Sequence, residues 1–338
     1  MFYLAGYAWL MHAKMPPFIY PPTSLPFYGF FALFNLELAG LLWMLLYLLA
    51  FLVALASLAL TMNGVRRAYL VSLTGLLFFT SYPLLIMMNL GQVDLLVGSL
   101  SVISLAMQRL RHENASAILL SIATLLKGPP VLLLIYFVLF RRDLGYLLRF
   151  GLATLLLVVA SLPVVPLRLY ANYFGTIAPR VSVVSSANLN QSLLSYLSTG
   201  GSSVIVAIVG LILLSLFTVG ITSRKFSSTN ASPLRGDAMF LLNILVILLL
   251  SPRIWPGTYV WIILPVALFL SNLLIGKTKS LYLMMVCFET FLLNANLTQL
   301  FLQYSQGYEI LPLAITGNIM LTIILILTLL RPPLALKI

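Results

Sequence analysis

Charged side chains are scarce in this sequence of 338 residues, of which 8% are charged and 62% hydrophobic. Soluble domains are typically about 45–50% apolar, so the composition excludes an ordinary soluble protein. The few charges are unbalanced, with 19 Lys and Arg against seven Asp and Glu and a net charge of +12. Because the basic residues are scattered in small groups between apolar runs, we do not expect nucleic acid as a partner.

Cysteine and histidine are almost absent, which argues against two further kinds of site. The single cysteine, Cys287, cannot form an internal disulfide. Only His12 and His112 can supply imidazole ligands, and the topology argued below places them on opposite sides of a membrane, so a zinc site is not expected. The sequence also contains no Walker loop and no dinucleotide fingerprint, so we expect no ATP, nicotinamide cofactor or metal ion.

Long apolar runs dominate what is present, and the mean hydropathy is +1.09. Runs of about 20 apolar residues span a bilayer as helices, because a helix satisfies its own backbone amides. We therefore predict an all-α, polytopic membrane protein with a single transmembrane domain over residues 1–338 and no soluble domain. About eleven segments are expected. They are roughly residues 31–60, 68–87, 94–108, 115–126, 130–140, 146–165, 202–222, 238–250, 258–275, 281–299 and 311–330. Segments 115–126 and 130–140 form a short broken pair, because Pro129 and Pro130 interrupt the helix.

The distribution of Lys and Arg predicts the orientation of these segments. When successive loops are assigned to alternate sides, fourteen of the 19 basic residues fall on one side, which the positive-inside rule makes cytoplasmic. The other five are Lys14, Lys127, Arg168, Arg180 and Arg253. The N-terminal segment is then outside the cell membrane and the C-terminus is cytoplasmic. The external side holds the loop 1–30 and the long loop 166–200.

Two of the seven carboxylates, Asp94 and Glu289, lie within apolar segments. A charge there costs several kcal/mol unless it is paired or faces water, which makes both residues functional candidates. The alternative for Asp94 is a capping role, in which Asn89 or Asp94 accepts backbone amide bonds at a helix start. Three other carboxylates lie beside basic residues in cytoplasmic loops and are expected to form solvated ion pairs: Glu113, Asp143 and Asp237.

Cationic and amide side chains on the external side suggest where a phosphorylated or hydroxylated ligand binds. Lys127 lies at the break in the short pair, and Arg253 lies at an external helix end beside Trp255. A cation near a helix N-terminus suits a phosphate. The alternatives are a lysine that snorkels to the interface and an aromatic belt. The run Asn190-Gln191-Ser192 offers amide and hydroxyl groups to a hydroxylated ligand.

Five short motifs follow one another along the chain: YPP at 20–22, GQVD at 91–94, KGPP at 127–130, NQS at 190–192 and SPRIW at 251–255. In this order they resemble the patterns YPP, GQ-x-N/D, K-x-P, NQS and SP-x-x-W of glycosyltransferase family 87, which has the GT-C membrane fold. The resemblance implies transfer of a sugar, often mannose, from a polyprenyl-phosphate donor to a glycan or lipid acceptor on the extracytoplasmic face.

The resemblance suggests roles for the candidate residues. Asp94 is the catalytic candidate, because it is the carboxylate available to accept the proton of an acceptor hydroxyl. We assign Lys127 and Arg253 to the donor phosphate. The residues assigned to the sugar or the acceptor are Tyr20, Asn89, Gln92, Asn190, Gln191, Ser192 and Trp255.

The sequence departs from the family pattern in one respect. Similar proteins carry an Asp near the start of the first external loop, after a membrane helix, whereas no carboxylate precedes Glu37 here. We expect this sequence to lack that helix and that base. Either the start codon is misassigned or the truncation is real, in which case the protein is a donor-binding relative without activity unless Asp94 serves as the base. A separate alternative is a transporter or lipid flippase, since transporters also use broken helices and intramembrane carboxylates.

Overall fold

The computed structural model describes residues 2–13, 18–141, 143–182, 233–251, 254–275 and 313–330. The chain divides into two compact units. Unit 1 contains residues 1–61, 84–131 and 143–183, and unit 2 contains residues 62–83, 132–142 and 184–338. The described residues form helices and no strand, so the all-α class is confirmed for this part of the chain.

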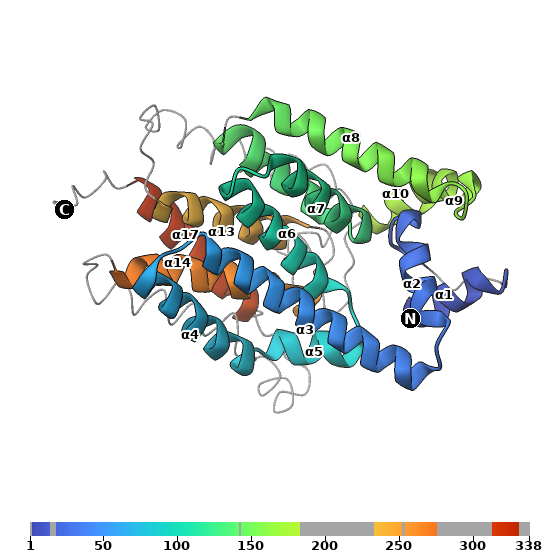
Figure 1. Ribbon diagram of the computed structural model, residues 1–338, viewed down its shortest axis with the longest axis horizontal. Coiled ribbons are helices and arrows are strands. Elements are labelled where there is room, and N and C mark those ends of the chain that lie inside the picture. The colour runs from blue at the N-terminus through green and yellow to red at the C-terminus, as the bar shows by residue number, and fades with distance from the viewer. Residues whose placement is uncertain are drawn as a thin grey trace. The chain divides into compact units, whose positions relative to one another are not determined.

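A row of four helices forms most of unit 1. The helices α3 (Leu36–Leu60), α6 (Asp94–Arg109), α7 (Glu113–Leu126) and α8 (Leu144–Ser161) pack in that order, each against the next (Figure 1). Because α6 lies between α3 and α7, most of its side chains are buried. The start of α6 therefore lies beside the end of α7, and the first residue of α6 lies close to the residue that follows α7.

The segment predicted as the loop 1–30 is largely helical. It contains α1 (Phe2–Leu10), the short 3-10 helix η1 (Pro22–Ser24) and α2 (Leu25–Ala32). The helices α1 and α2 pack so closely that a Cβ atom on Gly6 would lie 2.5 Å from the carbonyl oxygen of Tyr28. This hairpin was not predicted from the sequence, because neither helix contains a charged residue to mark its ends.

The break predicted after α7 is present. The helix ends at Leu126, and the 3-10 helix η2 (Pro129–Leu133) and the π-helix η3 (Ile135–Phe140) follow. A proline lacks an amide donor and disfavours helical geometry in the residue before it, so Gly128 and Pro129 cannot continue α7.

The described part of the predicted loop 166–200 is also helical. It contains α9 (Leu167–Asn172), the π-helix η4 (Tyr173–Ile177) and α10 (Ala178–Ser182).

Unit 2 is built around α13 (Pro233–Leu250). This helix packs against α14 (Ile263–Ile275), α17 (Leu313–Leu330), η3 and the 3-10 helix η5 (Pro256–Ile262), and α14 packs against α4 (Gly64–Thr80). The predicted segment 68–87 is interrupted at Ser81, after which α5 (Tyr82–Leu90) begins. Pro83 has no amide with which to continue α4. The predicted segments 202–222 and 281–299 lie outside the described residues.

The prediction for Asp237 is wrong. Its side chain is not in a solvated loop but is buried in α13, where it accepts a hydrogen bond of 2.5 Å from the amide of Asn272 on α14. The sequence pattern placed the helix start at residue 238, and the structure begins it at Pro233. This shift moves Asp237 from the loop into the helix interface.

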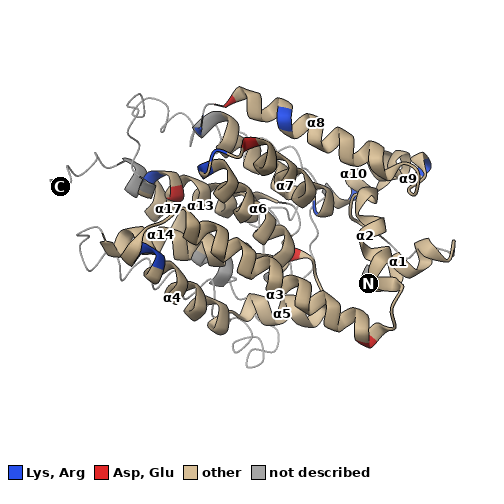
Figure 2. Cartoon of the chain, in the orientation of Figure 1, with Lys and Arg blue, Asp and Glu red and all other residues tan. Residues whose placement is uncertain are grey.

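The apolar helices give the chain the character of a membrane protein. Three described helices are long and apolar enough to cross a membrane, or four if α4 and α5 count as one bent span, so the prediction of about eleven is not confirmed. The sides of α3 and α8 that face away from the other helices of unit 1 expose leucines such as Leu48, Leu49, Leu155 and Leu156. Figure 2 shows that charged residues lie mostly near helix ends, as expected where a helix interior meets lipid.

Candidate functional site

An ion pair joins the two residues that the sequence singled out in unit 1. The Nζ atom of Lys127 lies 2.5 Å from Oδ1 of Asp94. The Asp94 side chain is fully buried, and that of Lys127 is 12% exposed. Asp94 is the first residue of α6, and Lys127 directly follows the last residue of α7. The hairpin formed by these two helices thus brings a buried carboxylate and an ammonium together across 33 positions of sequence.

Two alternative readings of these residues are wrong. Asp94 does not cap α6, because the residue before the helix is Val93 and no side chain makes a cap hydrogen bond there. Lys127 does not snorkel away from the protein, because its ammonium binds Asp94. Each charge offsets the desolvation cost of the other, which explains how both are accommodated in an apolar interior.

The turn before Asp94 depends on Gly91. The amide of Gly91 donates to the carbonyl of Met88, and the amide of Gln92 donates to that of Met87, which together close the C-terminus of α5 as a Schellman motif. Gly91 has φ +60°, the left-handed conformation that a residue with a Cβ atom adopts at a cost. The glycine of the GQ motif therefore fixes the direction in which the chain enters α6.

Tyr47 on α3 also holds this turn. Its buried hydroxyl donates a hydrogen bond to the backbone carbonyl of Gln92. A buried carbonyl without such a partner would be costly, so Tyr47 stabilises the position of the turn against α3. Tyr47 was not identified from the sequence, where it is one aromatic residue in a long apolar run.

The tyrosine of the YPP segment packs among other aromatic side chains. The Tyr20 ring packs against Phe18 and Tyr28, with centroid distances of 5.8 and 6.4 Å. Burial raises the pKa of the Tyr20 hydroxyl, and the negative charge of Asp94 raises it further. The hydroxyl therefore stays protonated at physiological pH.

The helix η1, which contains the second proline of YPP, contacts α7 and α8. The YPP segment therefore packs against the helix that Lys127 follows.

Two polar atoms in the GQVD motif have no hydrogen-bond partner. They are Oδ2 of Asp94 and Oε1 of Gln92, and both atoms are buried. A carboxylate with one oxygen bound to an ammonium and the other open can accept a proton or a hydroxyl hydrogen bond. The ammonium is a cation within reach of a phosphate that approaches Asp94.

Two of the remaining predicted site residues are described, and four are not. The side chain of Asn89 is exposed near the end of α5, and Trp255 precedes η5 in unit 2. Arg253, Asn190, Gln191 and Ser192 lie outside the described residues. Within the described ranges, no group of three or more His, Cys, Asp or Glu side chains is placed to hold a metal ion.

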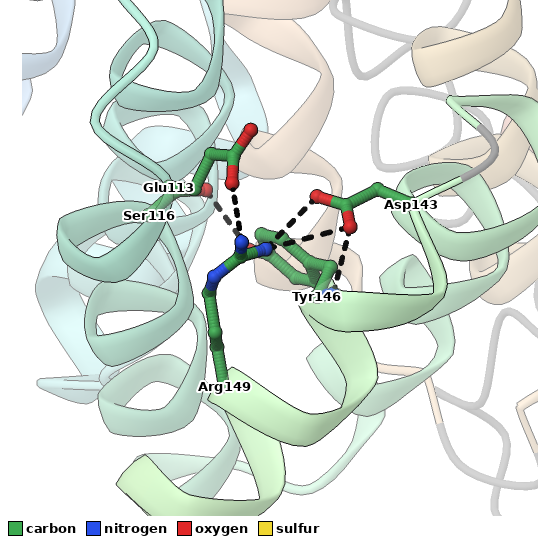
Figure 3. Close-up of polar contacts among 5 residues, drawn as sticks. All are labelled: Glu113, Ser116, Asp143, Tyr146 and Arg149. Carbon is green, nitrogen blue, oxygen red and sulfur yellow. Dashed lines mark hydrogen bonds and ion pairs between the residues drawn. The ribbon is translucent and has the colours of Figure 1, made fainter.

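A second polar cluster lies at the N-terminal ends of α7 and α8 (Figure 3). Arg149 binds Glu113 at 2.8 Å and Asp143 at 3.2 Å, which confirms the ion pairs predicted for these two carboxylates. Asp143 also caps α8 by accepting from the amide of Tyr146. The Tyr146 hydroxyl lies 2.9 Å from that of Ser116, in a buried cluster. All these side chains are paired with one another, so the cluster joins helices and does not present open groups to a ligand.

The fold and the site define a helical membrane protein with a buried carboxylate paired with an ammonium. The family model of glycosyltransferase family 87 matches residues 18–252, more than half of the 338-residue chain. The chain belongs to this family and is a glycosyltransferase by membership. Searches of curated proteins and of solved structures find no match.

Proposed function

We propose that the protein transfers a sugar, mannose or another hexose or pentose, from a polyprenyl-phosphate donor to a glycan or lipid acceptor on the extracytoplasmic face. Lys127 and Arg253 bind the donor phosphate, and Asp94 accepts the proton of the acceptor hydroxyl. Tyr20, Gln92, Asn190, Gln191 and Ser192 contact the sugar or the acceptor, as do Asn89 and Trp255.

The observation that carries this proposal is a buried ion pair that joins two motifs of the family pattern. Asp94 of GQVD and Lys127 of KGPP are 33 positions apart in sequence and form this pair, and η1, which begins at Pro22 of YPP, contacts α7. Structural ion pairs usually leave no oxygen unsatisfied in a buried position, whereas Asp94 Oδ2 has no partner. A group that is buried, charged and open on one side fits a catalytic carboxylate.

The external location rests on the distribution of charge. Lys127 is one of the five basic residues that the alternation of loops places outside. The contact between Asp94 and Lys127 supports this assignment, because it requires the start of α6 and the end of α7 to share one side of the membrane.

The proposed reaction forms one bond and breaks another at the anomeric carbon of the sugar. The acceptor oxygen attacks that carbon while its proton passes to Asp94 Oδ2, and the bond between the carbon and the phosphate oxygen breaks. The leaving group is the polyprenyl phosphate, whose developing negative charge is stabilised by Lys127 and Arg253. These roles use only side chains of this chain.

The test is sugar transfer in membranes that contain the protein, with radiolabelled polyprenyl-phosphate mannose and total lipid and glycan acceptors. The wild type should transfer label, and Asp94→Asn should reduce transfer by about 100-fold or more, the range typical of a lost general base. Glu113→Gln is the matched control, because Glu113 belongs to the separate cluster around Arg149 and its loss should leave transfer unchanged. Equal transfer by Asp94→Asn and the wild type would refute the role of Asp94.

A further inference from the structure

Four buried polar atoms without a hydrogen-bond partner belong to the GQVD motif, to η1 and to the last turn of α7. They are Asp94 Oδ2, Gln92 Oε1 and the hydroxyl oxygens of Thr23 and Thr124. Most buried polar atoms in a folded protein are satisfied, so open ones on segments that contact one another indicate a missing partner.

These four side chains come from segments that meet. Thr23 lies in η1, directly after the prolines of YPP, and η1 contacts α7. Thr124 lies in the last turn of α7, three residues before Lys127, which directly follows the helix. Gln92 precedes Asp94 by two residues, and Lys127 binds Asp94. The open atoms therefore lie on the two segments that supply the ion pair and on η1, which contacts α7.

We propose that Thr23 and Thr124, together with Gln92, form the subsite that binds the hydroxyl groups of the transferred sugar, so that these two threonines help to determine which sugar is accepted. This inference rests on the proposed function and names a part of its substrate site. Two hydroxyls and an amide can each donate or accept, as neighbouring sugar hydroxyls require.

The surroundings of the subsite suit a sugar better than a lipid chain. Tyr20 precedes Thr23 by three residues, and its ring packs against Tyr28, so this segment carries apolar ring faces, while the open atoms offer hydrogen bonds. A sugar ring presents both kinds of surface, whereas a prenyl chain would leave the threonine hydroxyls unsatisfied.

The test replaces each threonine by valine, which has the same shape and lacks the hydroxyl. Purified wild type, Thr23→Val and Thr124→Val are titrated with polyprenyl-phosphate mannose, polyprenyl-phosphate glucose and sugar-free polyprenyl phosphate, and binding is followed as the rise in melting temperature. We expect each variant to bind at least one of the sugar-bearing lipids about tenfold more weakly than the wild type. Binding of sugar-free polyprenyl phosphate should be unchanged.

The melting temperature without ligand separates a binding role from a structural one. A hydroxyl without a partner in the protein is lost without cost, so both variants should melt at or above the wild-type temperature. Thr154→Val is the matched control, because the Thr154 hydroxyl donates to Ser121 at 3.0 Å. This control should melt lower and bind all three lipids normally.

Three results would overturn the inference. A lower melting temperature of the Thr23 and Thr124 variants with unchanged lipid binding would mean that ordered water satisfies these hydroxyls. Equal weakening for all three lipids would place them at the phosphate or the prenyl chain. Failure of the wild type to bind either sugar-bearing lipid would overturn the inference together with the proposed donor.

Weakened binding of the sugar-bearing lipids in a protein that shows no transfer would support the subsite and refute only the proposed function.

Discussion

At the scale of single residues, the pairing of Asp94 with Lys127 is the main feature of this protein. Each of the two charges alone would be costly in the apolar interior of unit 1, and each offsets the cost of the other. The sequence identified both residues, because an ionisable side chain in an apolar context is conspicuous. It did not predict their contact, because the register of the hairpin formed by α6 and α7 depends on packing that no single segment reveals.

A double-mutant cycle tests the pair itself. Lys127→Met should lower the free energy of unfolding by about 3 kcal/mol, because it leaves a buried carboxylate without its cation. Adding Asp94→Asn should recover most of that loss, because the unpaired charge is then gone. The measurement is the unfolding free energy, or the melting temperature, of the wild type, both single variants and the double variant. Strictly additive effects would mean that the two side chains do not interact.

Gly91 gives a second prediction at this scale. Gly91→Ala should destabilise the protein by about 1–2 kcal/mol, because its φ of +60° is unfavourable for a residue with a Cβ atom. The control is Gly151→Ala in the middle of α8, where a Cβ atom meets nothing within 4 Å and alanine favours the helix. Melting temperatures should move down for the first variant and stay or rise for the second. A decrease of similar size in both would argue against the role of the left-handed turn.

At the scale of elements, sequence predicted best those helices whose ends carry charged or proline residues. The predicted segments 94–108 and 115–126 agree within two residues with α6 and α7, which begin at Asp94 and Glu113. The helices α1 and α2 were missed because they contain no charged residue, and the break at Ser81 was missed because the apolar run continues across it. Tyr47 could not be assigned, since its role depends on the packing of α3 against α6.

The contacts between α7 and α8 allow a prediction about how this helix pair is stabilised. Arg149→Gln should change the unfolding free energy by less than about 1 kcal/mol, and less still at high salt, because this ion cluster is partly exposed to solvent. Tyr146→Phe should cost about 1 kcal/mol or more at any salt concentration, because its hydroxyl belongs to a buried cluster. Unfolding measured at low and high salt separates the two. A salt-dependent loss in Tyr146→Phe would contradict this assignment.

At the scale of the whole molecule, the orientation in the membrane is a prediction from charge alone. It is tested by labelling single cysteines in intact cells after Cys287→Ser removes the native thiol. Leu33 and Asn63 are exposed at the two ends of α3, and α3 is long enough to span the membrane. We expect Leu33→Cys to react with an impermeant reagent from outside and Asn63→Cys to react only after permeabilisation. The reverse pattern would place Asp94 and Lys127 on the cytoplasmic side.

The most direct test of the central claim measures donor binding and chemistry separately in Asp94→Asn. The claim is that Asp94 is the base of a sugar transfer whose donor is held beside it by Lys127. In single-turnover experiments with polyprenyl-phosphate mannose, the variant should bind the donor with near wild-type affinity, and its transfer rate should fall by about 100-fold or more. Transfer at the wild-type rate, or a loss confined to donor affinity, would contradict the account.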